Sequence, residues 1–179
     1  MAATTSLTID DFERLPSDQA ENHELVDGEL VPMSSGTFEH NSIRDWFLVL
    51  THPIVRERDL GRVVAEQEYD FGGNAHAPDV SFFGSAKLAL LDPKKRVQRF
   101  VPDLAIEIVS ASDTVTSLWR KKDRYRACGT SEVWIVLPES REVAIFADGS
   151  DRILRGSAEL STVLIPGFRI TVDELFQGF

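Results

Sequence analysis

Cysteine is almost absent from this chain. Its 179 residues include one, Cys128, so no disulfide can form within the chain. Such a composition fits a reducing compartment, and we expect a cytoplasmic location. Cys128 stands in the stretch Tyr-Arg-Ala-Cys-Gly, which is typical of a helix end. A small buried residue is a more common occupant of that position than a nucleophile.

Long hydrophobic runs are absent as well. No stretch approaches the ~20 apolar residues that cross a bilayer, and the N-terminus lacks a basic segment followed by an apolar one. We therefore expect no membrane partner. The hydrophobic content of 42% is enough to build a proper core. These properties predict one soluble domain over residues 1–179.

Basic residues are outnumbered, with 19 Lys and Arg against 29 Asp and Glu and a net charge of −10. This balance argues against non-specific binding to nucleic acid. The distribution is uneven, because nine basic and four acidic residues between Lys94 and Arg126 give that segment +5 and leave −15 elsewhere. The segment either attracts an anionic ligand or is an ordinary solvated surface.

Hydrophobic periodicity predicts an α+β domain with a mixed sheet. A hairpin is expected in His23–Pro32, where Asp27-Gly28 separates two short apolar runs. Helices are expected over Asp10–Leu15 after a Thr8 cap, over Thr37–Arg58 with a bend or end near Pro53, from a cap at Ser112 or Asp113 to Cys128, and over Thr171–Phe176. Strands are expected over Arg62–Phe71, Ala77–Phe83, 103–110, Glu132–Leu137, Glu142–Ala147, Arg152–Arg155 and Val163–Ile165.

The most informative stretch is Val101–Ser110, an aliphatic strand that contains a charge. Leu104 to Val109 has the composition of a buried strand, yet Glu107 lies within it. A carboxylate in apolar surroundings costs several kcal/mol unless a cation or a hydrogen-bond donor meets it. The candidate partners are a metal ion and the downstream lysines Lys121 and Lys122.

Strand geometry decides which other acids can join Glu107. Asp103 lies on the same face of the strand but about 13 Å away, which is too far to share an ion. Asp79, in Pro78-Asp79-Val80, can lie about 5 Å away if the two strands pair. Two carboxylates and the backbone carbonyl of Ile108 would suit Mg²⁺ or Mn²⁺. The alternative is that each Pro-Asp pair merely opens a strand.

Several motifs together resemble the Uma-two family (putative restriction endonucleases) of the PD-(D/E)XK nuclease-like superfamily. The match extends over nearly the whole chain and in the right order. It rests on Leu7–Leu15, His23-Glu24-Leu25-Val26-Asp27-Gly28-Glu29-Leu30, Glu39-His40, Pro78-Asp79-Val80, Pro102-Asp103-Leu104-Ala105-Ile106-Glu107-Ile108-Val109-Ser110, Lys121-x3-Tyr125-x3-Gly129, Glu132-Val133-Trp134-Ile135-Val136 and Pro166-Gly167-Phe168.

The resemblance implies a restriction-endonuclease-like fold, with a mixed sheet flanked by helices. It assigns Asp79 and Glu107 to the two acidic positions of the superfamily motif. The superfamily's lysine would stand at Val109, and here the Lys-x3-Tyr pattern moves it to Lys121. Lys122 borders the same helical stripe and stays the alternative. Glu24 matches an N-terminal glutamate of the family, with a role as a further ligand of a metal or a water.

The resemblance favours a Mg²⁺-dependent endonuclease acting on DNA. Two alternatives stay open: a nuclease-like module without activity that binds or regulates, and a metal hydrolase acting on a small phosphorylated molecule. Cutting both strands of a duplex needs two sites, so we expect a homodimer. Its interface would use apolar residues of the C-terminal hairpins, and DNA would contact the basic segment. The interface residues are Val143, Ile145, Phe146, Phe168 and Phe176, and the DNA contacts are Lys94, Lys95, Arg96, Arg99, Arg120, Lys122 and Arg124.

Overall fold

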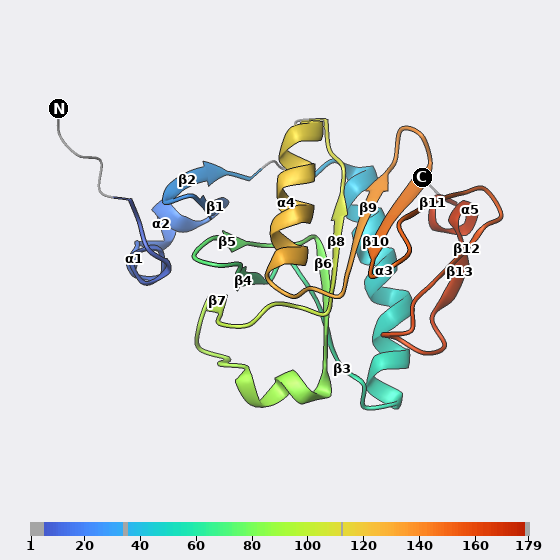
Figure 1. The fold of residues 1–179 in the computed structure, drawn as a ribbon, viewed down its shortest axis with the longest axis horizontal. Helices are drawn as coiled ribbons and strands as arrows, with labels where there is room; N and C mark the ends of the chain where they lie inside the picture. The colour runs from blue at the N-terminus through green and yellow to red at the C-terminus, as the bar shows by residue number, and fades with distance from the viewer. Residues whose placement is uncertain (1–5, 34–35, 112, 178–179) are drawn as a thin grey trace.

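The computed structural model describes residues 6–33, 36–111 and 113–177 of the chain. A six-stranded sheet forms its centre, in the order β11-β10-β9-β8-β6-β3 (Figure 1). The strands of this sheet are β3 (Gly61–Ala65), β6 (Val80–Gly84), β8 (Leu104–Ile108), β9 (Glu132–Leu137), β10 (Glu142–Ala147) and β11 (Arg152–Arg155). β8 and β9 run parallel and every other neighbouring pair is antiparallel, so the sheet is mixed, as predicted.

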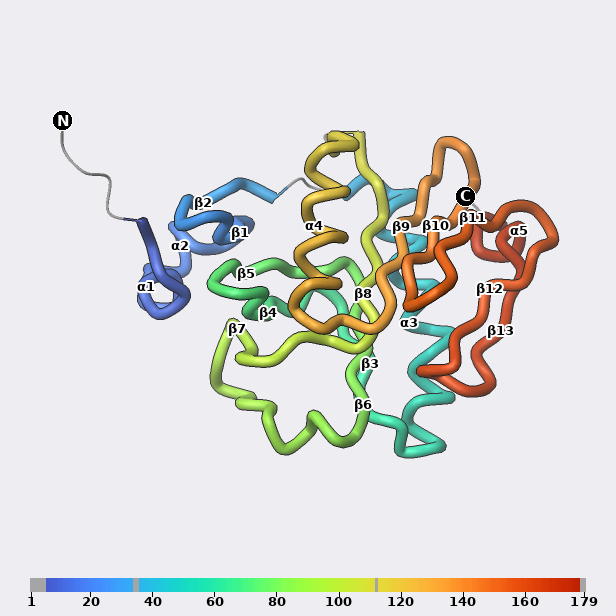
Figure 2. Tube along the Cα trace, in the orientation of Figure 1, coloured from blue at the N-terminus to red at the C-terminus, as the bar shows by residue number. Residues whose placement is uncertain are grey.

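A smaller five-stranded sheet, in the order β2-β1-β5-β4-β7, lies to one side of the centre (Figure 2). Its strands are β1 (His23–Val26), β2 (Glu29–Pro32), β4 (Glu68–Asp70), β5 (Ala75–His76) and β7 (Val97–Gln98). A hairpin of β12 (Glu159–Ser161) and β13 (Arg169–Thr171) lies on the opposite side. The helices are α1 (Ile9–Arg14), α2 (Ser17–Ala20), α3 (Phe38–Glu57), α4 (Val115–Ala127) and α5 (Val172–Leu175), and η1 (Ser85–Leu90) is a 3₁₀ helix.

The two faces of β8 explain where Glu107 points. Leu104, Ile106 and Ile108 alternate onto one face, where they join the core that packs against α3. Ala105 lies on the other face and joins a second cluster that includes Tyr125 of α4. Glu107 shares this second face, so the fold directs its carboxylate towards α4, which lies beside β8 (Figure 1).

Most of the expected elements are confirmed. The hairpin turn at Asp27 and Gly28 has positive φ at both residues, as a tight type I′ hairpin requires. Thr8 forms the expected capping box with Asp11 at the start of α1. α3 continues through Pro53 and ends at Glu57.

Three predictions of local structure were wrong. The stretch Arg62–Phe71 is two strands, β3 and β4, which join different sheets after a break at Glu66, whose φ is +52°. Val163–Ile165 is a turn between β12 and β13. Thr114 caps α4, one residue beyond Asp113, whereas Ser112 lies outside the described residues. No helix in the described ranges is both long and apolar enough to cross a membrane.

Candidate active site

Asp79 and Glu107 are brought together by the pairing of β6 with β8. Val80 pairs with Ile106 in this antiparallel ladder, so one further step places Asp79 opposite Glu107. The backbone N–H of Ile108 donates to Oδ2 of Asp79 at 2.6 Å, which fixes the Asp79 carboxylate beside the end of β8. The expectation that the strands carrying these two acids are neighbours is therefore confirmed.

Glu107 is buried, with 7% of its surface exposed. The Tyr125 hydroxyl donates to its Oε1 at 2.7 Å, and Nζ of Lys121 lies 3.4 Å from its Oε2. Burial raises the pKa of Glu107 to about 7; the ammonium of Lys121 lowers it and the nearby charge of Asp79 raises it further. The charge of Lys121 thus offsets only part of the energetic cost of burying this carboxylate.

Glu24, on β1, is also buried. Its Oε1 lies 2.9 Å from Nζ of Lys121, and its Oε2 lies 3.1 Å from Nδ1 of His76. Burial opposes ionisation of Glu24, but His76 and Lys121 outweigh it and lower the pKa to about 2. Burial likewise acts to lower the pKa of Lys121, and the carboxylates of Glu107 and Glu24 together raise it. Lys121 is therefore a charged bridge between two carboxylates.

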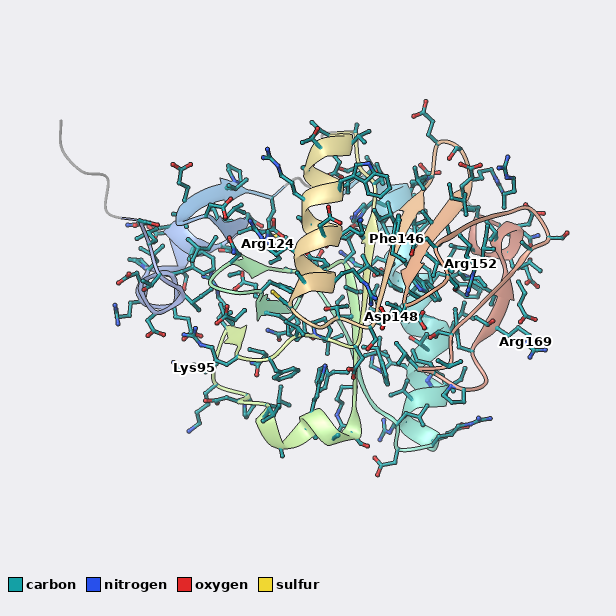
Figure 3. The ribbon with its side chains drawn as sticks, in the orientation of Figure 1. Lys95, Arg124, Phe146, Asp148, Arg152 and Arg169 are labelled. Atoms are coloured by element: carbon teal, nitrogen blue, oxygen red, sulfur yellow. The ribbon has the colours of Figure 1, made fainter. Side chains whose placement is uncertain are left out.

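Lys122 points away from this cluster. Its ammonium pairs with Asp123 and lies 5.3 Å from the ring centroid of Trp119 and 5.0 Å from that of Phe146. Phe146 and Arg124 lie on opposite sides of α4 (Figure 3). Of the two candidate lysines, the structure brings Lys121 to the carboxylates and leaves Lys122 on the outer aromatic surface.

His40 was assigned no role from the sequence, yet it contacts Asp79. Nε2 of His40, in the first turn of α3, lies 3.2 Å from Oδ1 of Asp79. This hydrogen bond raises the pKa of His40, and burial opposes the shift in part. A Cβ added at Gly36 would come within 2.7 Å of Nδ1 of His40, so a glycine there leaves room for the ring. The sequence signal that could have identified His40 was its place in the Glu39-His40 pair of the family match.

These side chains line one open cavity of about 500 Å³. Ile108 lies in its wall beside the two acids, and Ser117 and Lys121 enter from α4. The full lining is Glu24, Val31, Pro32, Met33, Gly36, His40, Glu66, Ala77, Asp79, Glu107, Ile108, Asp113, Thr114, Ser117 and Lys121. The four residues predicted to be catalytic, Glu24, Asp79, Glu107 and Lys121, are thus together in one hollow.

The charge balance of the cavity suits a divalent cation. Three carboxylates, those of Glu24, Asp79 and Glu107, line the cavity beside the ammonium of Lys121. Burial is the main cause of the raised pKa of Glu107, and the negative charges of Asp79 and Glu24 add to it. In the described ranges no three His, Cys, Asp or Glu side chains are grouped to ligate one ion. Two carboxylates with remaining positions for water and phosphate oxygen are the usual protein contribution to a Mg²⁺ site, so the residues fit Mg²⁺ or Mn²⁺.

Comparison with known proteins shows the family and the fold. Residues 9–173 match the family model Uma2, described as "Putative restriction endonuclease". The chain belongs to the Uma2 family. A crystal structure described as that of "a putative nuclease" from Anabaena variabilis superposes with a TM-score of 0.84 at 19% sequence identity, over 95% of this chain and 97% of that one. This likeness confirms the α+β fold. A sequence search among curated proteins found no match.

In this Uma2 protein, none of the seven residues predicted to contact DNA lines the cavity. Three of the four in the loop at residues 94–99, which contains the short strand β7, pair with acids of the same chain: Lys95 with Glu13, Arg96 with Glu68, and Arg99 with Asp10 and Asp70. Arg96 lines a neighbouring hollow that shares Met33, Glu66 and Ala77 with the cavity. Figure 3 places Lys95 far from Arg124 and from α4. Arg124 pairs with Asp27, while Lys94 and Arg120 are exposed.

Four of the five residues predicted to form the dimer interface of this family member are inside the core. Val143, Ile145, Phe168 and Phe176 are at most 4% exposed, and Phe146 packs edge-on against Trp119. The expectation that these residues form an interface was wrong for Val143, Ile145, Phe168 and Phe176, because they pack in the core beside the main sheet. Dimerisation itself stays a prediction.

Asp103 and Cys128 make contacts that stabilise the fold away from the cavity. Asp103 accepts the backbone N–H of Gly84 at 2.7 Å and pairs with Lys87 at 2.7 Å, at the far end of β8 from Glu107. Cys128 is the C-cap of α4, and burial raises the pKa of its thiol, which disfavours the nucleophilic thiolate.

Proposed function

We propose that this Uma2 protein is a nuclease that hydrolyses phosphodiester bonds in DNA with the help of Mg²⁺ or Mn²⁺. The observation that carries the proposal is the convergence of a buried Glu107, Asp79 and Lys121 in one open cavity. The Uma2 membership and the likeness to a structure described as a nuclease support the same reaction class.

Asp79, Glu107 and the backbone carbonyl of Ile108 would hold the cation. When bound, it supplies Lewis-acid stabilisation of the negative charge that develops on the phosphate. The deprotonated state of Glu107 is needed for this role, and neutralisation of the two acids by a cation removes the cost of their proximity.

Lys121 would act on the reacting phosphate or on the water. Its pKa is raised, so the side chain stays protonated and can donate hydrogen bonds but cannot act as a base. Glu24 holds the ammonium at the edge of the cavity, where it can orient the attacking water or stabilise charge on a phosphate oxygen. The water oxygen forms the new bond to phosphorus and gives up a proton, one bridging phosphorus–oxygen bond breaks, and the departing oxygen takes up a proton.

The negative net charge of this protein would limit its contact with DNA to a short stretch of duplex. The −15 outside the basic segment repels duplex that extends beyond the cavity, and several predicted basic contacts are already paired within the chain. We infer about three to five phosphate contacts per site, with affinity falling by a slope of roughly −0.9 per contact as salt rises. Lys94, Arg120 and Lys122 are the contacts best placed to contribute, because Lys94 and Arg120 are exposed and Lys122 pairs with its sequence neighbour Asp123.

The same observations keep a second function in view, hydrolysis of a small phosphorylated molecule. The acidic surface and the internal pairing of the loop disfavour a long polyanion but not a small one. A cavity of about 500 Å³ would hold a nucleotide-sized ligand.

A panel of substrates separates the two functions and tests for activity at all. Purified protein is incubated with duplex DNA, single-stranded DNA, RNA, a chromogenic phosphodiester and a phosphomonoester, each with Mg²⁺, Mn²⁺ or chelator. The proposal expects cleavage of DNA that requires the metal. Turnover of the monoester alone would favour the small-molecule hydrolase, and no turnover of any substrate would favour a module that only binds.

A further inference from the structure

A series of polar contacts extends from the cavity to the surface, through residues that have no part in the proposed chemistry. His76, on β5, places Nδ1 3.1 Å from Oε2 of Glu24. Its other ring nitrogen, Nε2, lies 3.0 Å from Nη1 of Arg124 on α4. Nη2 of the same guanidinium lies 2.8 Å from Oδ1 of Asp27, in the turn between β1 and β2.

The arginine determines which nitrogen of His76 carries the proton. A guanidinium can only donate hydrogen bonds, so Nε2 of His76 must accept and must be unprotonated. The proton of the neutral ring is then on Nδ1, which faces the Glu24 carboxylate. A doubly protonated ring would set an N–H against the guanidinium. Burial, the largest influence on this imidazole, lowers its pKa and so also favours the neutral form.

The ring has little freedom to turn. His76 is 2% exposed, and its centroid lies 6.0 Å from that of Phe71 and 5.7 Å from that of Tyr125. Nδ1 has no other partner in the described ranges, and its approach to Glu24 is a close contact rather than a well-aligned hydrogen bond. Asp27, the outermost residue of this series of contacts, is also held in place, because its backbone N–H donates to Oδ1 of Asn74 at 2.7 Å.

We propose that Arg124 and His76 are positioning residues: Arg124 holds His76 in the Nδ1–H tautomer, His76 orients Glu24, and Glu24 orients Lys121 towards Glu107. The distances along this path are 3.0 Å, 3.1 Å, 2.9 Å and 3.4 Å. The effect on rate rests on the proposed nuclease function, whereas the tautomer of His76 does not.

This role competes directly with the earlier assignment of Arg124 to DNA contact. A phosphate contact contributes to affinity and to its salt dependence. A positioning residue instead contributes to the rate at saturating substrate. Partners that orient the groups around a metal site typically change activity about 10- to 100-fold when they are removed. The two roles therefore separate in one set of variants.

The first measurement is the ¹⁵N NMR spectrum of the four histidine rings at neutral pH. The signals of His76 are assigned by their loss in His76→Asn. In wild type we expect Nε2 to resonate as an unprotonated, pyridine-like nitrogen and Nδ1 as a protonated one. In Arg124→Met we expect Nε2 to gain a proton, because no donor then opposes it. Arg120→Met, an exposed arginine of the same helix, is the control and should leave the His76 signals in place.

The second measurement separates rate from affinity. We expect Arg124→Met to lower the cleavage rate at saturating DNA about 10- to 100-fold. DNA affinity and its salt slope, measured in Ca²⁺, should stay as in wild type. His76→Asn keeps an N–H near the position of Nδ1 and should retain more activity than His76→Leu. Thermal unfolding of each variant verifies that it is folded before its rate is compared.

The inference is overturned if wild-type Nε2 carries a proton, or if Nε2 stays unprotonated in Arg124→Met. It is also overturned if Arg124→Met weakens DNA binding and flattens its salt slope while the rate at saturation is unchanged. If no form of the protein cleaves DNA, the proposed function fails on its own, and the histidine spectra still decide whether Arg124 sets the tautomer.

Discussion

At the residue scale, Glu107 is the most informative position in the chain. Its charge conflicts with the aliphatic strand around it, and the fold resolves only part of the conflict through Tyr125 and Lys121. The remaining cost appears as the raised pKa. A residue that is held at a cost to the folded state, in a cavity open to solvent, is typical of a functional site.

The raised pKa of Glu107 has a consequence for stability. A carboxyl whose pKa is higher in the folded state, about 7, than its ordinary value of 4.5 stabilises the fold below that ordinary value, and the contribution is lost as pH rises to about 7. Without metal, wild type should therefore lose stability relative to Glu107→Gln between pH 4.5 and 7.5. Thermal unfolding across this range measures it, with Glu57→Gln, an exposed site, as the control. A constant difference between wild type and Glu107→Gln would contradict the raised pKa.

The two lysines of α4 give a second prediction. Lys121→Met should lower the cleavage rate roughly 10²- to 10³-fold, because a preorganised charge beside the reacting phosphate is lost. Lys122→Met, one residue away and facing Trp119, is the matched comparison and should affect mainly DNA binding. Single-turnover kinetics separate the two effects. If Lys122→Met were the more damaging to the chemical step, the choice of Lys121 would be wrong.

The site residues that could be inferred from the sequence are those whose signals lie within a few neighbouring residues. Glu107 and Asp79 stand out because a charge in a strand and a Pro-Asp pair are visible in a few residues. The contacts of His40 with Asp79 and of His76 with Glu24 join residues 39 and 52 positions apart, and periodicity carries no trace of them. Glu24 was found by resemblance alone, and its burial was not foreseen.

At the element scale, the β8–α4–β9 unit positions the chemistry. The parallel pair needs a crossover, and α4 supplies it while directing Lys121 and Tyr125 onto the face of β8 that carries Glu107. The hairpin and the long helix were predictable because their turn and cap signals are local. The division of Arg62–Phe71 was not, because the positive φ of Glu66 reflects the surrounding fold. The apolar residues near Ile165 belong to the core without forming a strand.

The loop at residues 94–99, which contains the short strand β7, carries the third prediction. Because Lys95 and Arg99 pair with acids of α1, changing Lys94, Lys95, Arg96 and Arg99 all to Gln should loosen the contact with α1. We expect a lower unfolding temperature and only a slightly flatter salt slope of DNA binding in Ca²⁺. Lys94→Gln alone, which breaks no ion pair between side chains, is the control. A slope that falls by about one per charge removed would show that the loop contacts DNA.

At the scale of the whole molecule, two sheets meet around the cavity. The smaller sheet contributes Glu24 and His76, and the main sheet with α3 and α4 contributes Glu107, His40 and Lys121. The site therefore depends on the docking of the N-terminal hairpin against the centre, and no single element holds it. The net charge, in turn, restricts how a polyanion can approach.

The fourth prediction is that the chain forms a homodimer, because cutting both strands of a duplex needs two sites in matching orientation. Val143, Ile145, Phe168 and Phe176 are in the core, so the interface must use other residues. Light scattering at micromolar concentration should give twice the chain mass of 20.0 kDa. A single species at the chain mass would contradict it, and such a monomer should nick one strand of a duplex.

The central claim is that Asp79 and Glu107 together hold one divalent cation, and calorimetric titration with Mn²⁺ or Mg²⁺ tests it most directly. We expect one site per chain in wild type, binding that weakens as pH falls below about 7 because Glu107 is then protonated, and loss of that binding in Asp79→Ala and in Glu107→Ala. Asp103→Asn, at the other end of β8, should bind the metal as wild type does. Binding as tight as wild type in either Asp79→Ala or Glu107→Ala would contradict the account.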